Sequence, residues 1–306
     1  MFKNNHPAYF YTSDKVRIFY NTNFKKNEFD PKKTLLIFNY GLVCSNYHWK
    51  FQLPFFDEHN FQILIHDYRG HFSSSKKGDY RDINFYNITR DLFEIVFSMS
   101  KKALNKNIIL IGHSMGVNIS IEFARRYPDF VKGMVLISGT PYSPKDVMFN
   151  SNLSHFLFKL LRVVKDKFPN GLNAFWKSSY LNPLARWIIY DGGFNKNFTD
   201  KKFVETYMKR IGELDIDLFI HLMDEMHFHE GISHFSNINS PTLIIGGDKD
   251  KLVPNYLQKI YSINLRESEF YLVKEGSHVP QVDFPDSINE RIFNFIKKRC
   301  LYEEFQ

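Results

Sequence analysis

One serine of the chain stands in a pattern that is typical of nucleophilic catalysis. The run Ile-Ile-Leu-Ile-Gly-His-Ser114-Met115-Gly-Val consists of a short apolar segment, a Gly-x-Ser-x-Gly motif and the start of a helical pattern. A sharp strand-to-helix turn of this kind strains the serine backbone and lifts its hydroxyl above the sheet. The Met115 N–H would then lie at a helix N-terminus, which favours a developing negative charge. The motif predicts that Ser114 is a nucleophile for acyl transfer.

A serine nucleophile needs a base, and the base needs a carboxylate that orients it. Two loops that follow apolar runs supply both kinds of group. The loop Gly-Gly-Asp-Lys-Asp-Lys-Leu-Val-Pro holds Asp248 and Asp250, and the loop Lys-Glu-Gly-Ser-His-Val-Pro holds His278. The C-terminal ends of parallel strands share one edge of a sheet. We therefore expect His278 and one of the two aspartates to lie near Ser114.

The scaffold that positions these residues is predicted from short apolar runs separated by amphipathic segments. Such runs are typical of strands buried on both faces of a parallel sheet, and the segments between them predict crossover helices. An alternating segment at 9–20 predicts a β-hairpin. The sequence thus predicts an α/β fold with a doubly wound, mostly parallel sheet. The expected strands are 34–38, 62–66, 107–111, 133–137, 241–245 and 269–273, and the expected helices include 83–100, 115–127 and 255–263.

Residues 141–239 interrupt this alternation, because they contain helical patterns and no convincing strand. The sequence predicts a core of residues 1–140 and 240–306, with 141–239 as a helical cap over the strand ends where open α/β sheets bind ligands. Helices are expected near 153–164, 183–190, 200–211 and 214–227. Aromatic side chains would make the pocket under the cap apolar; they are Phe149, Phe156, Phe158, Phe168, Phe175, Trp176, Trp187 and Phe194.

These motifs resemble those of the α/β-hydrolase superfamily, and among its members the lidded serine esterase and lipase branch that includes monoacylglycerol-lipase-like enzymes. The family's Asp-x-x-Val-Pro segment matches residues 250–254, its Gly-x-His-x-Pro loop matches 276–280, and its Asp-x-Arg-Gly-His loop matches 67–71. The resemblance implies that the acid is Asp250 rather than Asp248. It also implies a catalytic triad of Ser114, Asp250 and His278.

The family's His-Gly oxyanion loop corresponds here to Tyr40-Gly41-Leu42, with Trp49 at the usual distance downstream. The resemblance implies that the backbone N–H groups of Leu42 and Met115 bind the oxyanion. Tyr40 in place of histidine changes the local hydrogen bonding of the loop. Because the donors are backbone groups, the oxyanion hole itself can survive the change.

Composition excludes several other classes of protein. The chain has 306 residues, 43% of them hydrophobic and 24% charged, so a disordered chain is excluded. No apolar run approaches the roughly 20 residues of a membrane span. The first residues offer no apolar signal segment, and the two cysteines, Cys44 and Cys300, are expected to stay reduced, so a cytoplasmic location is predicted. The net charge of +7 is spread along the chain, so no nucleic-acid partner is expected.

No cofactor and no metal are expected from the sequence. The histidine- and acid-rich stretch of the cap lacks a helical ligand spacing; it comprises His221, Asp224, Glu225, His227, His229, Glu230 and His234. The basic, amphipathic segment 153–164 is expected chiefly to pack as a cap helix. Its alternative is contact with an anionic membrane surface.

The predicted function is hydrolysis of a carboxylic ester by a serine hydrolase, through an acyl-enzyme intermediate. The expected partner is a small-molecule ester with an apolar acyl or alcohol part. The same triad also serves thioesterases, C–C bond hydrolases, aminopeptidases and acyltransferases, and one fold can host all of them. A non-catalytic binding protein is the alternative from another class. Such proteins typically lack a triad residue, and none is missing here.

Overall fold

The computed structural model describes residues 2–75, 79–99, 107–143, 153–229 and 232–301. Its centre is an eight-stranded sheet in the order β1-β2-β4-β3-β5-β6-β7-β8. The β1–β2 and β2–β4 pairs are antiparallel, and every other neighbouring pair is parallel. The strands are β1 (His6–Tyr11), β2 (Arg17–Thr22), β3 (Leu35–Asn39), β4 (Gln62–His66), β5 (Ile108–His113), β6 (Val131–Ile137), β7 (Thr242–Gly247) and β8 (Ser268–Val273). The predicted hairpin and mostly parallel sheet are confirmed.

Helices cover both faces of the sheet, because successive side chains of a strand point to opposite faces. Leu35 and Ile37 pack in one buried cluster with α2 (Phe85–Met99), α3 (Met115–Arg126) and α10 (Asn255–Asn264). Leu36 and Phe38 pack in another with α1 (Gln52–Glu58) and α12 (Pro285–Phe295). The continuous apolar runs that became β3, β4, β5, β6 and β7 are therefore strands buried on both faces, as predicted. The same prediction is wrong for β8, an edge strand in which only Val273 is buried.

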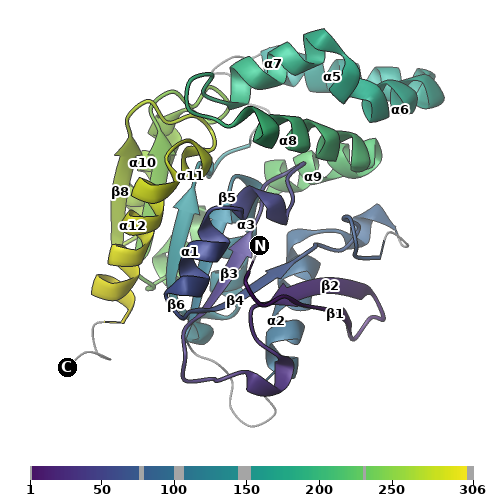
Figure 1. The fold of residues 1–306 in the computed structure, drawn as a ribbon. Coiled ribbons are helices and arrows are strands. Elements are labelled where there is room, and N and C mark those ends of the chain that lie inside the picture. Colours follow the sequence, from purple (N-terminus) through teal and green to yellow (C-terminus); the bar gives the residue numbers. More distant parts are fainter. Residues whose placement is uncertain (1, 76–78, 100–106, 144–152, 230–231, 302–306) are drawn as a thin grey trace.

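Five α-helices lie between β6 and β7 within the described residues. They are α5 (Leu153–Lys167), α6 (Pro169–Ser178), α7 (Pro183–Gly193), α8 (Lys201–Glu213) and α9 (Ile216–Phe228). Figure 1 shows them above the sheet, with α5, α6 and α7 outermost and α8 and α9 beneath them. Helix α6 was not predicted from the sequence. The predicted limits of the cap, 141 and 239, stay predictions.

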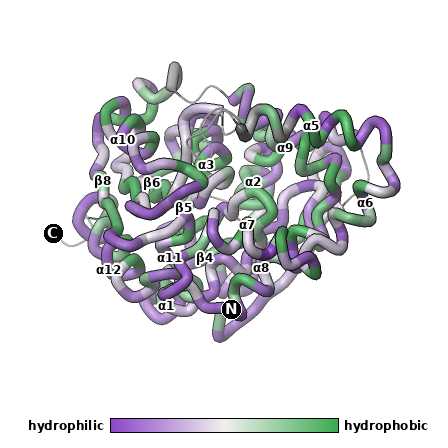
Figure 2. Tube along the Cα trace, turned by 90° about the horizontal axis from the view of Figure 1, so that it is seen from above, coloured by the Kyte–Doolittle hydropathy of each residue, from purple (hydrophilic) through white to green (hydrophobic). Residues whose placement is uncertain are grey.

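The cap helices mix polar and apolar residues along their length. Seen from above, α5 to α9 gather on one side of the molecule and alternate between hydrophobic and hydrophilic stretches (Figure 2). None of the described helices is long and apolar enough to cross a lipid bilayer. The cap thus contributes amphipathic helices to the region above the strand ends.

Candidate active site

Ser114 lies in a strained turn between β5 and α3. Its backbone has φ 53° and ψ −121°, a combination that a residue with a side chain rarely adopts. The turn is anchored because Ser114 N–H donates to the Ile137 carbonyl at 2.9 Å. Strain of this kind persists only where the surroundings impose it, and it is common at functional sites. The structure therefore places Ser114 at the strand-to-helix turn that the sequence predicted.

The two glycines of the motif are required by close packing. A Cβ on Gly116 would lie 2.0 Å from the carbonyl oxygen of Asn39 in β3. A Cβ on Gly112 would lie 2.5 Å from the carbonyl oxygen of Gly116. Both contacts are far shorter than van der Waals distance, so any side chain would push α3 away from the sheet. The glycines hold the start of α3, and with it Ser114, against the strand ends.

Asp250 and His278 form a buried pair in the loops after β7 and β8. His278 Nδ1 lies 2.9 Å from Asp250 Oδ2, and the Asp250 side chain is fully buried. The other carboxylate oxygen accepts hydrogen bonds from the N–H groups of Leu252 and Val253, each at 2.9 Å. Both carboxylate oxygens are thus engaged, and these contacts fix the carboxylate in one orientation. That orientation keeps the proton of His278 on Nδ1 and leaves Nε2 as the basic nitrogen.

Asp248, the alternative acid, does not pair with the histidine. Within the described residues no hydrogen bond joins Asp248 to His278, and Asp248 instead lies 4.0 Å from the Lys249 ammonium. The geometry favours Asp250, the aspartate that the resemblance to the α/β-hydrolases implied. Sequence reasoning could distinguish Asp250 from Asp248 only through the Asp-x-x-Val-Pro segment, because both aspartates follow the same strand.

The predicted oxyanion donors are the backbone N–H groups of Met115, which follows Ser114, and of Leu42, in the loop after β3. Met115 is the first residue of α3, so its N–H has no acceptor within the helix. Within the described part of the chain, the Leu42 N–H likewise has no protein acceptor. Leu42 and Ser114 line the same cavity. Two unpaired backbone donors near one serine hydroxyl are the arrangement that stabilises a tetrahedral oxyanion.

Tyr40, which replaces the expected histidine, is fully buried and bonded to Tyr68. The Tyr40 hydroxyl accepts from Tyr68 N–H at 3.1 Å, and the Tyr68 hydroxyl donates to the Tyr40 carbonyl at 2.8 Å. Their ring centroids are 4.2 Å apart. The tyrosine pair therefore secures the loop that carries Leu42, a role that sequence reasoning did not anticipate.

A cavity of about 480 Å³ lies between the strand ends and the cap. Ser114 and His278 line it, and neither Ser114 Oγ nor His278 Nε2 has a hydrogen-bond partner among the described residues. The hydrogen bond between a catalytic serine and its histidine is often long or absent until substrate binds. The side chains that the cap contributes are mostly apolar; they include Phe175, Trp176, Ile189, Phe194, Tyr207, Ile211, Phe219, Met223 and Met226.

The aromatic side chains predicted for the pocket divide into two groups. Phe175, Trp176 and Phe194 line the cavity. In contrast, Phe156, Phe168 and Trp187 are at least 60% exposed, and the prediction that they line the pocket is wrong. Helical periodicity marks an apolar face but does not say what that face contacts. Phe149 and the Phe158 side chain lie outside the described part of the structure.

The histidine and acidic side chains of the stretch 221–234 contact different parts of the protein. His221 Nε2 lies 3.1 Å from the Ile83 carbonyl, Asp224 pairs with Arg162, and His229 Nε2 lies 3.5 Å from Glu122. Glu230 and the His234 side chain lie outside the described residues.

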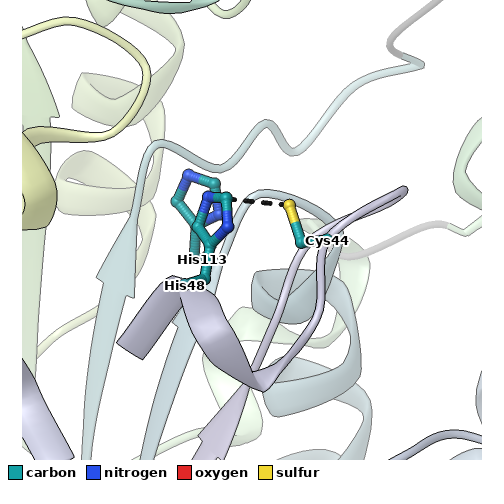
Figure 3. Close-up of side chains that lie close together, drawn as sticks. All are labelled: Cys44, His48 and His113. Carbon is teal, nitrogen blue, oxygen red and sulfur yellow. Dashed lines mark hydrogen bonds between the residues drawn. The ribbon is translucent and has the colours of Figure 1, made fainter. Parts of the chain in front are cut away.

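A different cluster, missed by sequence reasoning, lies beside the candidate residues Ser114 and His278. Cys44, His48 and His113 are buried, and their sulfur and one nitrogen of each ring lie within 4.8 Å of one another (Figure 3). They come from the loop after β3, the short 3₁₀ helix Asn46–Trp49 and the end of β5. Burial lowers the pKa of His48 to about 3 and that of His113 well below its usual value, and it raises the pKa of the Cys44 thiol. All three side chains are therefore uncharged near neutral pH.

Comparison with known families agrees with the fold and with the strand-to-helix turn that carries Ser114. Residues 34–285 match the family model for the alpha/beta hydrolase fold, and the chain belongs to that family. The predicted family and fold are confirmed.

Several individual proteins are similar to the chain. Human protein ABHD8 is 25% identical over 265 residues, which cover 86% of this chain and 55% of ABHD8. The bifunctional esterase/perhydrolase DCH of Acinetobacter calcoaceticus is 26% identical, with 95% of this chain and 99% of DCH covered. Bromoperoxidase from Bacillus anthracis superposes with a TM-score of 0.74 at 19% identity, over 96% of this chain and 100% of that chain. This chain thus spans about half the length of ABHD8 and nearly all of the other two.

Proposed function

We propose that the protein is a serine hydrolase that cleaves carboxylic esters through an acyl-enzyme intermediate. The observation that carries the proposal is the buried Asp250–His278 pair, 2.9 Å apart, which opens onto the same cavity as the strained Ser114. The fold supplies the serine turn, and the two loops supply base and acid. The similarity to DCH, which is named an esterase and perhydrolase, supports an ester substrate.

In the proposed reaction, His278 Nε2 takes the proton of Ser114 Oγ as the oxygen attacks the ester carbonyl. Asp250 stabilises the imidazolium that forms, and its two backbone hydrogen bonds keep it in place. The Leu42 and Met115 N–H groups stabilise the oxyanion, each contributing on the order of 10²–10³ in rate. His278 then protonates the departing alcohol. Finally it activates a water that releases the acyl group and restores the free serine.

The cavity supports an apolar substrate. Its volume of about 480 Å³ lies in the range of small-molecule sites, and its walls are mainly aliphatic and aromatic side chains of the cap. Burial of apolar surface contributes about 25 cal/mol per Å² to binding, so an ester with a longer acyl or alcohol chain gains affinity here. We infer that the substrate carries such a chain on at least one side of the ester bond.

The test is a series of p-nitrophenyl esters of increasing acyl length, measured with wild type and Ser114→Ala. We expect turnover by wild type, none above background by the variant, and the highest kcat/KM at medium or long chains. A maximum at acetate would reject a long acyl chain, leave the alcohol side as the place for the apolar part, and keep the esterase. If no ester reacts above the variant's background, the ester proposal fails, and thioester, C–C or amide substrates must be tried. Failure of Ser114 to react with a fluorophosphonate would instead favour a non-catalytic binding protein.

We further propose that the outer cap helices contact an anionic lipid surface, from which an apolar ester could enter the cavity. Large apolar side chains are exposed along α5, α6, α7 and the turns between them: Phe156, Leu160, Val163, Phe168, Phe175, Leu181, Leu184 and Trp187. Monomeric proteins rarely expose so many apolar side chains together without an interaction partner. Within these three helices six basic residues outnumber two acidic ones. Arg162, Lys165 and Arg186 pair with acidic side chains of α8 and α9, so the other three, Lys159, Lys167 and Lys177, supply the excess that favours an anionic surface.

Co-sedimentation with vesicles tests this contact. Wild type should bind vesicles that contain phosphatidylserine and should bind pure phosphatidylcholine less. The double variant Phe168→Ser/Trp187→Ser should lose binding. The control Ile263→Ser, at an exposed apolar residue of α10 outside the cap, should keep it. Equal loss in both variants, or dimerisation of wild type through the cap, would contradict the proposal. The cytoplasmic location stays a prediction, which cell fractionation can test.

A further inference from the structure

The uncharged cluster of Cys44, His48 and His113 has the composition of a metal-binding site. Imidazole nitrogen and cysteine sulfur are ligands that Zn²⁺ prefers. Among the described residues, it is the single group of three or more such side chains with ligand atoms this close together. None of the three residues belongs to the proposed triad. Cys44, His48 and His113 all line the cavity that Ser114 and His278 also line.

One nitrogen of the cluster is a buried lone pair without a partner. His113 Nε2 lies 2.8 Å from the backbone carbonyl of His278. A carbonyl only accepts hydrogen bonds, so Nε2 carries the proton and Nδ1 carries the lone pair. His113 is 1% exposed, and its Nδ1 has no hydrogen-bond partner. A Cβ at Gly41 would lie 3.1 Å from this atom, so Nδ1 faces the loop that carries Cys44.

We propose that Cys44, His48 and His113 bind Zn²⁺, or a similar thiophilic transition-metal ion, at the wall of the catalytic cavity. Bond lengths of about 2.3 Å to sulfur and 2.0–2.1 Å to nitrogen place tetrahedral ligand atoms roughly 3.3–3.6 Å apart. Cys44 Sγ and His48 Nε2 are already 3.6 Å apart. The other separations are at most 4.8 Å. The His48 and His113 rings are stacked with their centroids 4.9 Å apart, so binding needs side-chain rotations that close about 1 Å and also turn both lone pairs toward the ion.

The binding step is balanced by release of one proton. The Cys44 thiol loses its proton to solvent and a Zn–S bond forms, while the two neutral imidazoles donate their lone pairs without further change. Ion and thiolate together then carry a charge of +1. The cavity supplies the fourth ligand position, for a water molecule, because all three protein ligands line it.

Occupation of this site would inhibit the hydrolase, an expectation that rests on the proposed function. His113 bonds to the backbone of His278, and their ring centroids are 5.0 Å apart. An ion that binds His113 would shift this ring and with it the His278 backbone that the ring bonds to. The ion would also draw Cys44 toward it, and Cys44 lies two residues from the oxyanion donor Leu42. We therefore expect loss of kcat.

Metal binding can be measured without any substrate. Chelator-treated full-length protein is dialysed against a buffered concentration of free Zn²⁺, and the bound metal is quantified. Wild type and Cys300→Ser, which removes the other buried cysteine, should each hold one Zn²⁺ per chain. Cys44→Ser and His48→Gln should weaken binding by about 100-fold or more, because changes outside the ligand shell alone cost 10–100-fold. In wild type, Co²⁺ should give a thiolate-to-metal charge-transfer band that Cys44→Ser lacks.

The outcomes separate the site from the proposed function. Equal Zn²⁺ binding by wild type and Cys44→Ser, or a Co²⁺ complex of wild type without the thiolate band, would overturn the metal site. The wild-type spectrum alone decides the matter if a variant fails to fold. Ester hydrolysis that Zn²⁺ inhibits in wild type and Cys300→Ser, with at least tenfold less inhibition in His48→Gln, supports the inhibitory role. If metal binds but no ester is cleaved, the site stands and the proposed function falls.

Discussion

Replacement of Asp250 by asparagine tests the assignment of the catalytic acid. One oxygen of Asp250 accepts two backbone N–H groups, and the other faces His278 Nδ1 at 2.9 Å. In Asp250→Asn the side-chain carbonyl should keep the two backbone donors, which turns the amide NH₂ toward His278. The histidine must then accept at Nδ1 and carry its proton on Nε2. In that tautomer it cannot take the proton of Ser114.

The magnitude follows from the alternative orientation. If the amide flipped so that its oxygen faced His278, two buried N–H groups would lose their acceptor. Each such loss costs about 1–3 kcal/mol, so the productive orientation is disfavoured by about 2–6 kcal/mol, or roughly 30- to 10⁴-fold. The same replacement in another serine-histidine-aspartate triad lowers kcat by about 10⁴ through the wrong tautomer. We therefore expect kcat to fall by about 10³–10⁴, with a fold that remains intact.

The assay compares kcat on the best p-nitrophenyl ester for wild type, Asp250→Asn and Asp248→Asn, with thermal unfolding of each. Asp248 is the matched control, because it lies two residues away in the same loop and does not bond to His278. Asp248→Asn should retain kcat within about threefold. A kcat for Asp250→Asn within tenfold of wild type, at unchanged stability, would refute the assigned role of Asp250. Equal losses in both variants would show a general effect on the loop.

Three further changes test how the site is built. Gly116→Ala should lower the free energy of unfolding by more than about 3 kcal/mol or abolish folding, because its Cβ would lie 2.0 Å from a β3 carbonyl oxygen. The control Gly171→Ala, in α6, should instead raise it by about 0.5–1 kcal/mol, because its Cβ meets nothing within 4 Å. Similar values for both variants in denaturant unfolding would contradict the packing argument. Tyr40→Phe should cost about 1–3 kcal/mol because it leaves the buried Tyr68 N–H without an acceptor; an unchanged thermal midpoint would show that this bond contributes nothing. Burial raises the pKa of Glu122, but hydrogen bonds from a histidine and an arginine outweigh it and lower the pKa to about 2. The ionised Glu122 therefore stabilises the folded protein above pH 4.5, the pKa of the carboxyl group in the unfolded chain, and this stabilisation is lost as pH falls from about 4.5 through 2. Glu122→Gln should lower the thermal midpoint at pH 7 but change it little at pH 2.5.

The scaffold and the placement of Ser114, Asp250 and His278 were predictable because each depends on a local pattern. A continuous apolar run such as that of β3 reports burial on both faces, and the structure sends its side chains alternately into two cores. The serine motif needs only a strand, two close-packed glycines and a helix start, all adjacent in sequence. Asp250 and His278 each follow a strand at the same sheet edge, so topology alone brings them together.

The cap was less predictable, since its helices have apolar side chains on more than one face. Trp176 donates its indole N–H to the Leu214 carbonyl at 2.9 Å and lines the cavity, whereas Trp187 is exposed. Both residues fit an amphipathic pattern, and only the packing of the helices on one another decides between them. Helix α6 was missed because its asparagines and glycine have weak helix propensity. Pro169 at its first turn is the signal that could have found it.

The metal-ligand cluster shows why some of the chemistry lies beyond local patterns. His113 follows from the serine motif, but its two partners come from a loop and a 3₁₀ helix about 65–70 residues earlier. What brings them together is the position of the oxyanion loop, which Tyr40 holds against Tyr68 through two hydrogen bonds. The adjacent Arg69 is in turn fixed by a buried ion pair with Asp91. The tyrosine that departs from the family pattern therefore does more than substitute for histidine. By anchoring the loop from behind, it leaves the Leu42 N–H unpaired for an oxyanion and leaves Cys44 facing the two histidines.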